Sequence, residues 1–203
     1  MPNNDKILAA AAQEFAQRGY AASSLAAISG HLGLTKGALV RRFPTKADLA
    51  RAIIATLRAV IEEKRVEAHS LYPESGLRQL VHFIFCVGTH AQDNSQAQAA
   101  IVLFTDRTSP AFEGLDVYAD WTAALSEFFR NAQEANEIED RLDARELAEY
   151  IFIINTGEAV FRARRFTSPQ MQALHFLQLA LRGLGAREID VITTEVIERE
   201  MNA

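Results

Sequence analysis

Residues 24–43, SLAAISGHLGLTKGALVRRF, decide the fold of this chain because they predict two short helices joined by a tight turn. Ser24, or Ser23 before it, can cap the first helix by accepting a hydrogen bond from a backbone N–H that has no helical partner. Gly33 lies at the bend, where a residue without a side chain can adopt backbone angles that other residues avoid. Thr35 can cap the second helix in the same way. The segment therefore predicts a helix-turn-helix.

The second of these helices is expected to keep small and basic residues on its outer side. Leu39 and Phe43 lie four positions apart and can both turn inward. A helix with small residues and cations on its free side can enter the major groove of DNA. The candidate DNA-binding residues are Ser24, Thr35, Lys36, Gly37, Ala38, Val40, Arg41, Arg42 and Lys46. The alternative is a pair of packed helices with no nucleic-acid role.

The N-terminal part of the chain resembles the TetR family of bacterial transcriptional regulators. The resemblance is carried by KILAAAAQEFAQRGY (residues 6–20), by the helix-turn-helix segment and by FPTKADLARAI (residues 43–53). Family members usually carry a tyrosine at the position of Val40 and often a histidine at that of Arg42. The chain departs from the family at both positions, where Arg41 and Arg42 can supply phosphate contacts instead.

Charge is divided unevenly along a chain of 203 residues whose formal net charge is −5. Residues 1–50 hold six basic and three acidic side chains, a net of +3, whereas the remaining residues hold 15 and 23, a net of −8. A basic DNA-reading end on an acidic body gives this distribution. Cys86 is the only cysteine, and no segment resembles a signal peptide or a membrane span. We therefore expect a cytoplasmic protein without membrane contact.

Apolar residues recur with helical periodicity through almost the whole chain, which predicts an all-α fold. We expect an N-terminal three-helix DNA-binding domain containing the helix-turn-helix in residues 1–50. A larger helical domain for ligand binding and dimerisation is expected in residues 51–203. The first helix should stop at Gly19, and the fourth should run from a Thr45 cap to His69 and link the domains. Later helices are expected at about 77–91, 99–105, 116–131, 144–165 and from Ser168-Pro169 to 184, and residues 188–201 form either a short surface helix or a partly disordered end.

The resemblance implies that the larger domain binds a small molecule and a second subunit. Residues 144–165 and the helix that follows carry more apolar surface than a single contact needs, so four such helices from two subunits could form a bundle. The homodimer would present two reading helices to a palindrome-like operator in double-stranded DNA, with half-sites about 34–36 Å apart. The alternative is that these helices wrap the core of a monomer.

Aromatic residues are spread through the helices expected to surround the centre of the larger domain. The candidate ligand-binding residues are Phe83, Phe104, Tyr118, Trp121 and Phe152, although aromatic residues at helical spacing are more often core. Trp121 is the strongest candidate, since it is the only tryptophan and follows a loop containing Pro110 and Gly114. Residues 100–121 also resemble the corresponding region of γ-butyrolactone receptors, a TetR subgroup in which a tryptophan at this place lines the pocket.

These inferences predict a DNA-binding transcriptional regulator, most simply a repressor that a small-molecule effector, such as a γ-butyrolactone-type signal, releases from its operator. A ligand that prefers a conformation with wrongly spaced reading heads lowers operator affinity, and the helix of residues 45–69 is the expected lever. An alternative is a dimeric regulator without a ligand. The two differ in whether the larger domain encloses a cavity of several hundred cubic ångströms.

A small helical enzyme is the remaining alternative. The chain has no G-x-S-x-G elbow, no phosphate-binding glycine loop and no catalytic pairing of side chains, so we expect neither enzymatic activity nor a cofactor. His82, Cys86 and His90 recur every four residues, but the two histidines would lie about 12 Å apart along a helix, too far to share one ion. An adjacent pair such as His82 and Cys86 could bind a metal only with ligands from elsewhere. We therefore predict histidines packed in a core and no metal site.

Overall fold

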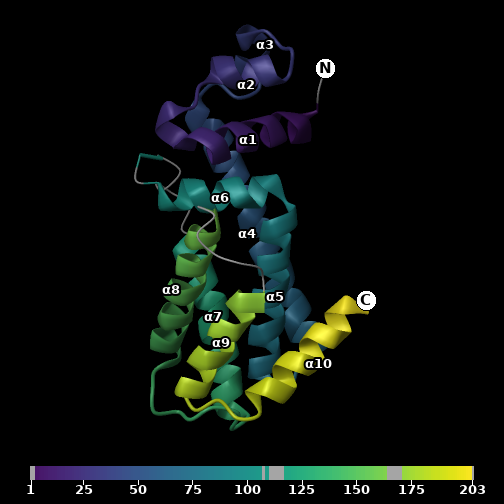
Figure 1. Ribbon diagram of the computed structural model, residues 1–203, viewed down its shortest axis with the longest axis vertical. Helices are drawn as coiled ribbons and strands as arrows, with labels where there is room; N and C mark the ends of the chain where they lie inside the picture. Colours follow the sequence, from purple (N-terminus) through teal and green to yellow (C-terminus); the bar gives the residue numbers. More distant parts are fainter. Residues whose placement is uncertain (1–2, 107, 110–116, 164–170, 203) are drawn as a thin grey trace. The chain divides into compact units, whose positions relative to one another are not determined.

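The structure is a computed structural model that describes residues 3–106, 108–109, 117–163 and 171–202 (Figure 1). Within these residues the chain is all-α, as the periodicity predicts, and contains no strand. The helices are α1 (Asn4–Ala22), α2 (Leu25–His31), α3 (Lys36–Val40), α4 (Lys46–Leu71), α5 (Gly76–Asp93), α6 (Ser95–Thr105), α7 (Val117–Glu134), α8 (Ala144–Ala163), α9 (Met171–Gly183) and α10 (Ile189–Met201). None of these described helices combines the length and the hydrophobicity that crossing a membrane requires. The expected breaks at Pro110, Gly114 and Ser168-Pro169 lie outside the described residues.

The chain packs as two compact units. The first unit comprises residues 1–59 and 90–117, and the second comprises residues 60–89 and 118–203. The helices α4 and α5 each contribute residues to both units. The functional division expected at residue 50 stays a prediction, because compact units report which residues pack together and not what they do.

The first unit contains α1, α2, α3, the first half of α4, and α6. Its core is apolar and almost completely buried, so removal of this surface from water is the main force that holds the short helices together. The core side chains include Ile7, Leu8, Ala11 and Phe15 on α1, Ile28 on α2, Leu39 on α3, and Leu49 and Ile53 on α4. The helix α6 lies along α1, which brings a segment from the middle of the sequence against the N-terminal helix.

The helical geometry of α1 ends at Gly19, as expected. Gly19 adopts φ 71°, ψ 175°, a conformation that residues with a side chain rarely occupy. The start of α4 also follows the prediction, since the Asp48 N–H donates to Thr45 Oγ1 at 3.1 Å and the Thr45 N–H donates to Asp48 Oδ2 at 2.9 Å. This reciprocal pair is a capping box, and the hydrogen bonds from Thr45 hold the pKa of the Asp48 carboxyl below its usual range.

The beginning of α6 differs from the prediction. The sequence suggests a polar connection up to about residue 97, whereas α6 begins at Ser95. The reason is Asn94, whose side chain accepts hydrogen bonds from the backbone N–H groups of Gln96 and Ala97 at 2.9 and 3.1 Å. A polar residue that caps a helix resembles a loop residue when only hydrophobicity is considered.

The second unit contains the rest of α4, most of α5, and α7 to α10. Its core is formed by apolar side chains from these helices: Leu77, Leu80, Val81 and Phe83 on α5, Leu125, Phe128 and Phe129 on α7, Leu147 and Ile151 on α8, Leu177 and Leu181 on α9, and Ile189, Ile192 and Val196 on α10. One side of α10 is therefore buried in this core, so residues 189–201 form a packed helix and not a partly disordered end. A Cβ at Gly76 would collide with the backbone of Phe128 and Ala132, so α5 and α7 approach closely at this glycine.

Candidate DNA-binding surface and ligand site

The helix-turn-helix forms with the caps that its sequence predicts. Ser24 Oγ accepts a hydrogen bond from the Ala27 N–H at 3.1 Å, and Thr35 Oγ1 accepts one from the Ala38 N–H at 3.3 Å. Gly33, at the turn, has φ 62°. A positive φ of this size is easily adopted only by a residue without a Cβ. Gly33 therefore sets the direction in which α3 leaves α2.

The outer side of α3 is formed by the predicted residues. Lys36, Gly37 and Arg41 are exposed, and Ala38 and Val40 are half-buried, whereas Leu39 is completely buried. The side chains of Lys36 and Arg41 make no hydrogen bond or ion pair within the part of the chain that the structure describes. Two cations, a bare backbone and a small apolar side chain therefore share one surface, as a major-groove helix requires.

Arg42 and Lys46 lie differently from the other candidate DNA-binding residues. Arg42 is exposed but donates from Nη1 to Asn4 Oδ1 on α1 at 3.3 Å. Lys46 donates from Nζ to the backbone carbonyls of Tyr20, Ala21 and Ser23 at 2.6, 3.3 and 2.9 Å. The Lys46 ammonium is thus already surrounded by acceptors, which compete with the DNA contact expected of it.

Glu14, His31 and Asp106 support the first unit around this surface, and none of them was predicted from the sequence. Glu14 on α1 is buried, and its Oε2 lies 3.1 Å from His31 Nε2 at the end of α2. The carboxylate of Asp106, after α6, accepts a hydrogen bond from the Tyr20 N–H at 3.0 Å. Hydrogen bonds from Thr108 are the main reason that the pKa of Asp106 is lowered. The only signal in the sequence is that Glu14 falls on the apolar side of its helix.

Four of the five candidate ligand-binding residues meet in the second unit. The ring of Trp121 packs edge to face on Phe83 and Phe152, with centroids 5.7 and 6.0 Å apart. Tyr118 packs edge to face on Phe152 at 5.1 Å. Phe104, on α6, belongs to the first unit. Phe83 and Phe152 are buried, Trp121 is half-buried and Tyr118 is exposed.

Trp121 has one feature that a core tryptophan rarely has. Its indole N–H is buried and has no hydrogen-bond partner among the described residues. Buried N–H groups are almost always paired, and leaving one unpaired costs roughly 1–3 kcal/mol.

A pocket of about 320 Å³ lies elsewhere in the second unit and is lined by Glu139, Arg141, Leu142, Leu147, Gly183 and Leu184. None of the candidate ligand-binding residues lines that pocket.

A second group of buried polar atoms lies on α8. Glu158 and Arg162 form an ion pair at 2.7 Å, yet Glu158 Oε1 and Arg162 Nη1 are buried without a hydrogen-bond partner in the described structure. Burial raises the pKa of Glu158, and the charge of Arg162 only partly offsets this. These atoms retain hydrogen-bonding capacity that no described residue uses.

The three residues weighed as metal ligands separate into two groups. His82 and Cys86 approach Glu200 on α10, whereas His90 is not part of this cluster.

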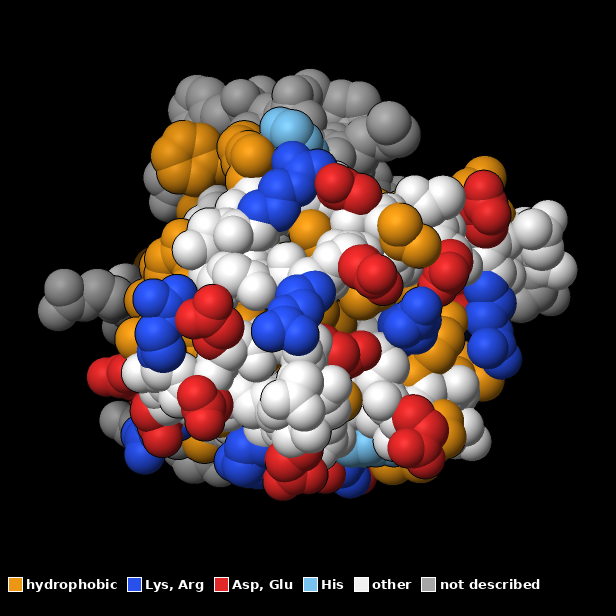
Figure 2. Space-filling model, turned by 90° about the horizontal axis from the view of Figure 1, so that it is seen from below, with side chains coloured by type: hydrophobic (Ala, Val, Ile, Leu, Met, Phe, Trp, Pro, Cys, Tyr) orange, Lys and Arg blue, Asp and Glu red, His pale blue; other side chains and the backbone are white. Residues whose placement is uncertain are grey.

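Figure 2 looks onto the end of the second unit and shows acidic and basic side chains interspersed among apolar ones. The basic side chains described on that face are separated by acidic and apolar ones.

Comparison with known proteins finds one family model and several solved structures that resemble this chain. Residues 7–53 match the model of "Bacterial regulatory proteins, tetR family". No curated protein matches the chain in sequence. Among solved structures, a γ-butyrolactone receptor described as ArpA-like has a TM-score of 0.82 and 22% identity, covering 98% of this chain and 96% of its own.

Two further solved structures share the fold. CprB from Streptomyces coelicolor, solved in complex with its biological operator sequence, has a TM-score of 0.76 and 22% identity over 98% of this chain and 97% of its own. PfmR from Thermus thermophilus, described as a TetR family transcriptional regulator, has a TM-score of 0.72 and 20% identity over 88% and 98%. The match of residues 7–53 and the fold shared over almost the whole chain confirm the resemblance to the TetR family: the N-terminal residues carry the family's pattern, and the chain shares its fold with TetR-family structures.

Proposed function

We propose that this chain is a homodimeric repressor that binds a palindrome-like operator and leaves it when a small molecule of the γ-butyrolactone type binds near Trp121. The observation that carries the effector part of the proposal is the buried, unpaired indole N–H within a cluster of aromatic rings. Such a group offers one directional hydrogen bond inside an apolar site, the usual composition of a small-molecule pocket.

The DNA-binding part rests on the outer side of α3. Lys36 and Arg41 are exposed cations that can reach base edges or phosphates, and Gly37 allows the backbone to approach the groove closely. Val40 can contact the methyl group of thymine, since it is apolar and half-buried. Ser24 and Thr35 cap helices whose N-termini favour a phosphate. Arg42 can exchange its bond with Asn4 for a phosphate, whereas Lys46 is the least suited of the predicted residues.

A lactone ligand fits the chemistry of the Trp121 cluster. The carbonyl oxygen of a lactone accepts hydrogen bonds and can pair with the indole N–H, which removes the cost of the unpaired donor. The rings of Phe83 and Phe152 offer apolar surface for an alkyl chain on the lactone. The regulator without a ligand is less well supported, because in that case the buried indole N–H has no role.

The partner subunit is expected on the outer sides of α8 and α9. Large apolar side chains are exposed there, namely Tyr150, Ile153 and Phe161 on α8 and Phe176 and Leu179 on α9. Several large apolar side chains left exposed on neighbouring helices are typical of a protein interface. Two such helices from each subunit can form a four-helix bundle with two-fold symmetry.

Ligand and operator are coupled through α4 in this proposal. The helix contributes residues up to Ala59 to the first unit and residues from Val60 to the second. A ligand that favours one arrangement of the second unit can therefore bias the position of the DNA-binding surface through a continuous helix. Operator and effector must lower each other's affinity by the same factor, because the coupling free energy is shared.

The proposal is tested by footprinting the full chain on the DNA upstream of its own gene, with and without synthetic γ-butyrolactones that carry alkyl chains of different length. We expect a protected palindrome-like site, loss of protection with one of the lactones, and a dimer in sedimentation. Protection that survives every lactone and every cell extract would favour the regulator without a ligand. No protected site on any fragment would contradict the repressor proposal itself.

A further inference from the structure

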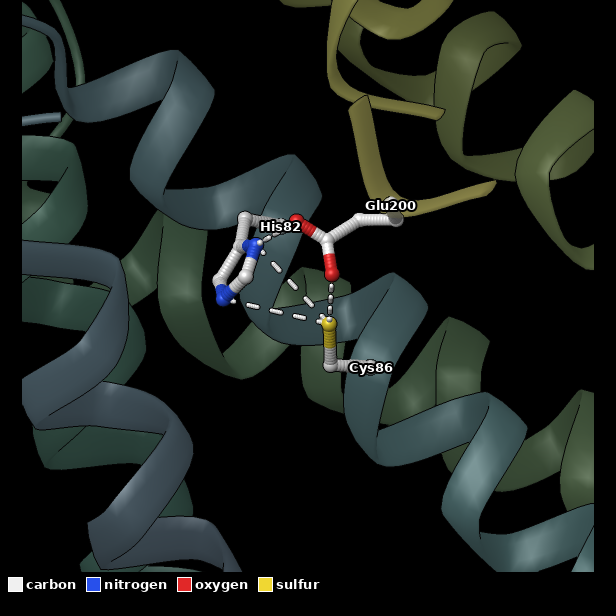
Figure 3. A group of neighbouring side chains, drawn as sticks. All are labelled: His82, Cys86 and Glu200. Carbon is white, nitrogen blue, oxygen red and sulfur yellow. Dashed lines mark hydrogen bonds and ion pairs between the residues drawn. The ribbon is translucent and has the colours of Figure 1, made fainter. Parts of the chain in front are cut away.

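The second unit holds a cluster of metal-ligating side chains that the DNA-binding function does not use. His82 and Cys86 lie one turn apart on α5, and Glu200 reaches them from α10 (Figure 3). His82 Nδ1 lies 3.1 Å from Glu200 Oε1, and Cys86 Sγ lies 3.4 Å from Glu200 Oε2. The sequence showed only the pair on α5, because Glu200 is more than one hundred residues away and joins it through tertiary packing.

The spacing of the donor atoms fits a small tetrahedral ion. Ligands at zinc-bond lengths of about 2.0–2.3 Å in a tetrahedron lie roughly 3.3–3.6 Å from one another. The imidazole nitrogen, thiol sulfur and carboxylate oxygens of the cluster all lie within 4.8 Å of one another, and the three pairs of residues approach at 3.1, 3.4 and 3.8 Å. An ion can therefore enter through rotation of side chains, without movement of either helix.

The surroundings of the cluster favour a bound cation. The His82 side chain is completely buried and that of Glu200 is 16% exposed, so the site is shielded from bulk water but remains reachable. A second carboxylate, that of Glu67 on α4, lies 3.8 Å from His82 Nε2, on the opposite side of the ring from the nitrogen that faces Glu200. This distance is too long for a hydrogen bond, but a small shift of Glu67 would let it accept one from Nε2, the contact that orients metal-binding histidines. Lys64, in turn, holds Glu67 at 2.6 Å.

We propose that His82, Cys86 and Glu200 form a zinc site that fastens α10 to α5. A nitrogen, a sulfur and an oxygen ligand from a protein match the preference of Zn²⁺, and a water molecule or anion can take the fourth position. Sγ lies 3.8 Å from both nitrogens of the His82 ring, which means that it is not aligned with either lone pair. The ring must turn about its Cβ–Cγ bond to bind the ion through Nδ1.

The same residues also interact when no ion is bound. Burial, followed by the charge and hydrogen bond of Glu200, raises the pKa of the Cys86 thiol to about 12, so the free thiol donates its proton to that carboxylate. A bound metal replaces this proton, since a coordinating thiol is deprotonated by the ion. The competing explanation of the cluster is that Glu200 only pairs with His82 and accepts the thiol hydrogen bond of Cys86, without any ion.

Cobalt provides a spectroscopic test of the site. The full chain is stripped with EDTA, dialysed and titrated with CoCl₂ in the absence of thiol reductants. We expect one ion for each chain, a sulfur-to-cobalt charge-transfer band in the near ultraviolet, the intense visible bands of tetrahedral cobalt, and displacement of cobalt by ZnCl₂. Zinc should also raise the melting temperature of the wild-type chain, because it binds the folded state.

Two substitutions and two controls locate the ion. Cys86→Ser should abolish the charge-transfer band, and Glu200→Gln should weaken cobalt binding by at least about tenfold. His90→Asn, on the same helix, and Glu195→Gln, on the same α10 but paired with Arg78, should leave the spectrum unchanged. Absence of the band in the wild-type chain, or its persistence in Cys86→Ser, would overturn the proposal. Circular dichroism confirms that each variant is folded before titration.

Discussion

Lys46 Nζ lies 2.6 Å from the carbonyl oxygen of Tyr20 and 4.2 Å from the centre of the Tyr20 ring. The same ammonium reaches the carbonyls of Ala21 and Ser23, which follow at the end of α1. The helical geometry of α1 ends at Gly19, so these carbonyls lie beyond the regular helix, where a side-chain cation can supply donors that helical hydrogen bonding does not. Lys46 therefore connects the start of α4 to the end of α1 within the first unit.

Replacing Lys46 should affect stability more than the number of DNA contacts. Lys46→Ala removes three hydrogen bonds from a charged donor, and we expect a loss of about 1–2 kcal/mol in the free energy of unfolding. The slope of log K for operator binding against log salt should stay unchanged. Lys36→Ala is the matched control. There the slope should become shallower by roughly the contribution of one phosphate contact, and the melting temperature should stay unchanged. The reverse pattern would place Lys46 on a phosphate.

Asp106 holds the other side of Tyr20, through the backbone N–H. We expect Asp106→Asn to reduce the free energy of unfolding by about 1 kcal/mol, because a charged acceptor for Tyr20 and Thr108 is lost. Asp93→Asn is the control, since Asp93 is exposed at the junction of α5 and α6 and accepts no hydrogen bond from the described residues. Equal melting temperatures for both variants would contradict the role of Asp106.

Low pH should reproduce part of the loss in the free energy of unfolding that Asp106→Asn causes. The pKa of Asp106 is lowered in the folded chain, so the carboxylate contributes stability that is fully present above its unfolded pKa of about 3.9. This contribution is lost as pH falls through the lower, folded pKa. The free energies of unfolding of the wild type and Asp106→Asn, measured in urea, should therefore converge at pH values below the folded pKa of Asp106, whereas a constant difference at all pH values would exclude the carboxylate as the cause.

Trp121→Phe should separate effector response from DNA binding. Phenylalanine preserves most of the ring packing against Phe83 and Phe152 but removes the buried N–H donor. We expect normal operator affinity, a melting temperature equal to or slightly above that of the wild type, and at least about a tenfold weaker response to the lactone, the equivalent of a lost hydrogen bond. Fluorescence anisotropy of labelled operator measures the response. An unchanged response would make Trp121 a core residue only.

Gly76 is required by close approach of two helices. Gly76→Ala introduces a Cβ that collides with the backbone of Phe128 and Ala132, and we expect a loss of about 3 kcal/mol. Gly88→Ala is a control on the same helix, because a Cβ there meets no atom within 4 Å. Alanine at Gly88 should stabilise the chain by about 0.5–1 kcal/mol, the usual gain within a helix. Urea denaturation distinguishes these outcomes by their sign.

The proposed dimer depends on the outer side of α8. Ile153 is 67% exposed there, and Ile153→Lys would place charges against each other across a two-fold interface. We expect sedimentation as a monomer and loss of operator binding of at least about a hundredfold, since a single reading head contacts only one half-site. Val191→Lys on α10 is the control, because Val191 is 53% exposed outside the proposed interface. A dimer that survives Ile153→Lys would require another interface.

Local rules were sufficient for most of the helices. Ser24, Thr35 and Thr45 cap the helices that they were expected to cap, and Gly19 and Gly33 adopt positive φ at the expected positions. These features depend on hydrogen bonds and steric clashes over a few residues, which the sequence displays directly. The Asn94 cap was missed because a capping residue and a loop residue have the same polarity.

The sequence by itself thus determined the all-α fold, the helix-turn-helix, its outer basic face and the resemblance of its N-terminal residues to the TetR family. Tertiary structure alone decided which distant side chains share a site: Asp106 and Lys46 on the backbone of Tyr20, and Glu200 beside His82 and Cys86. Helical periodicity shows which side of a helix is buried, but not which other helix covers it. That choice depends on how all the apolar surfaces pack together, and it is made by the whole chain at once.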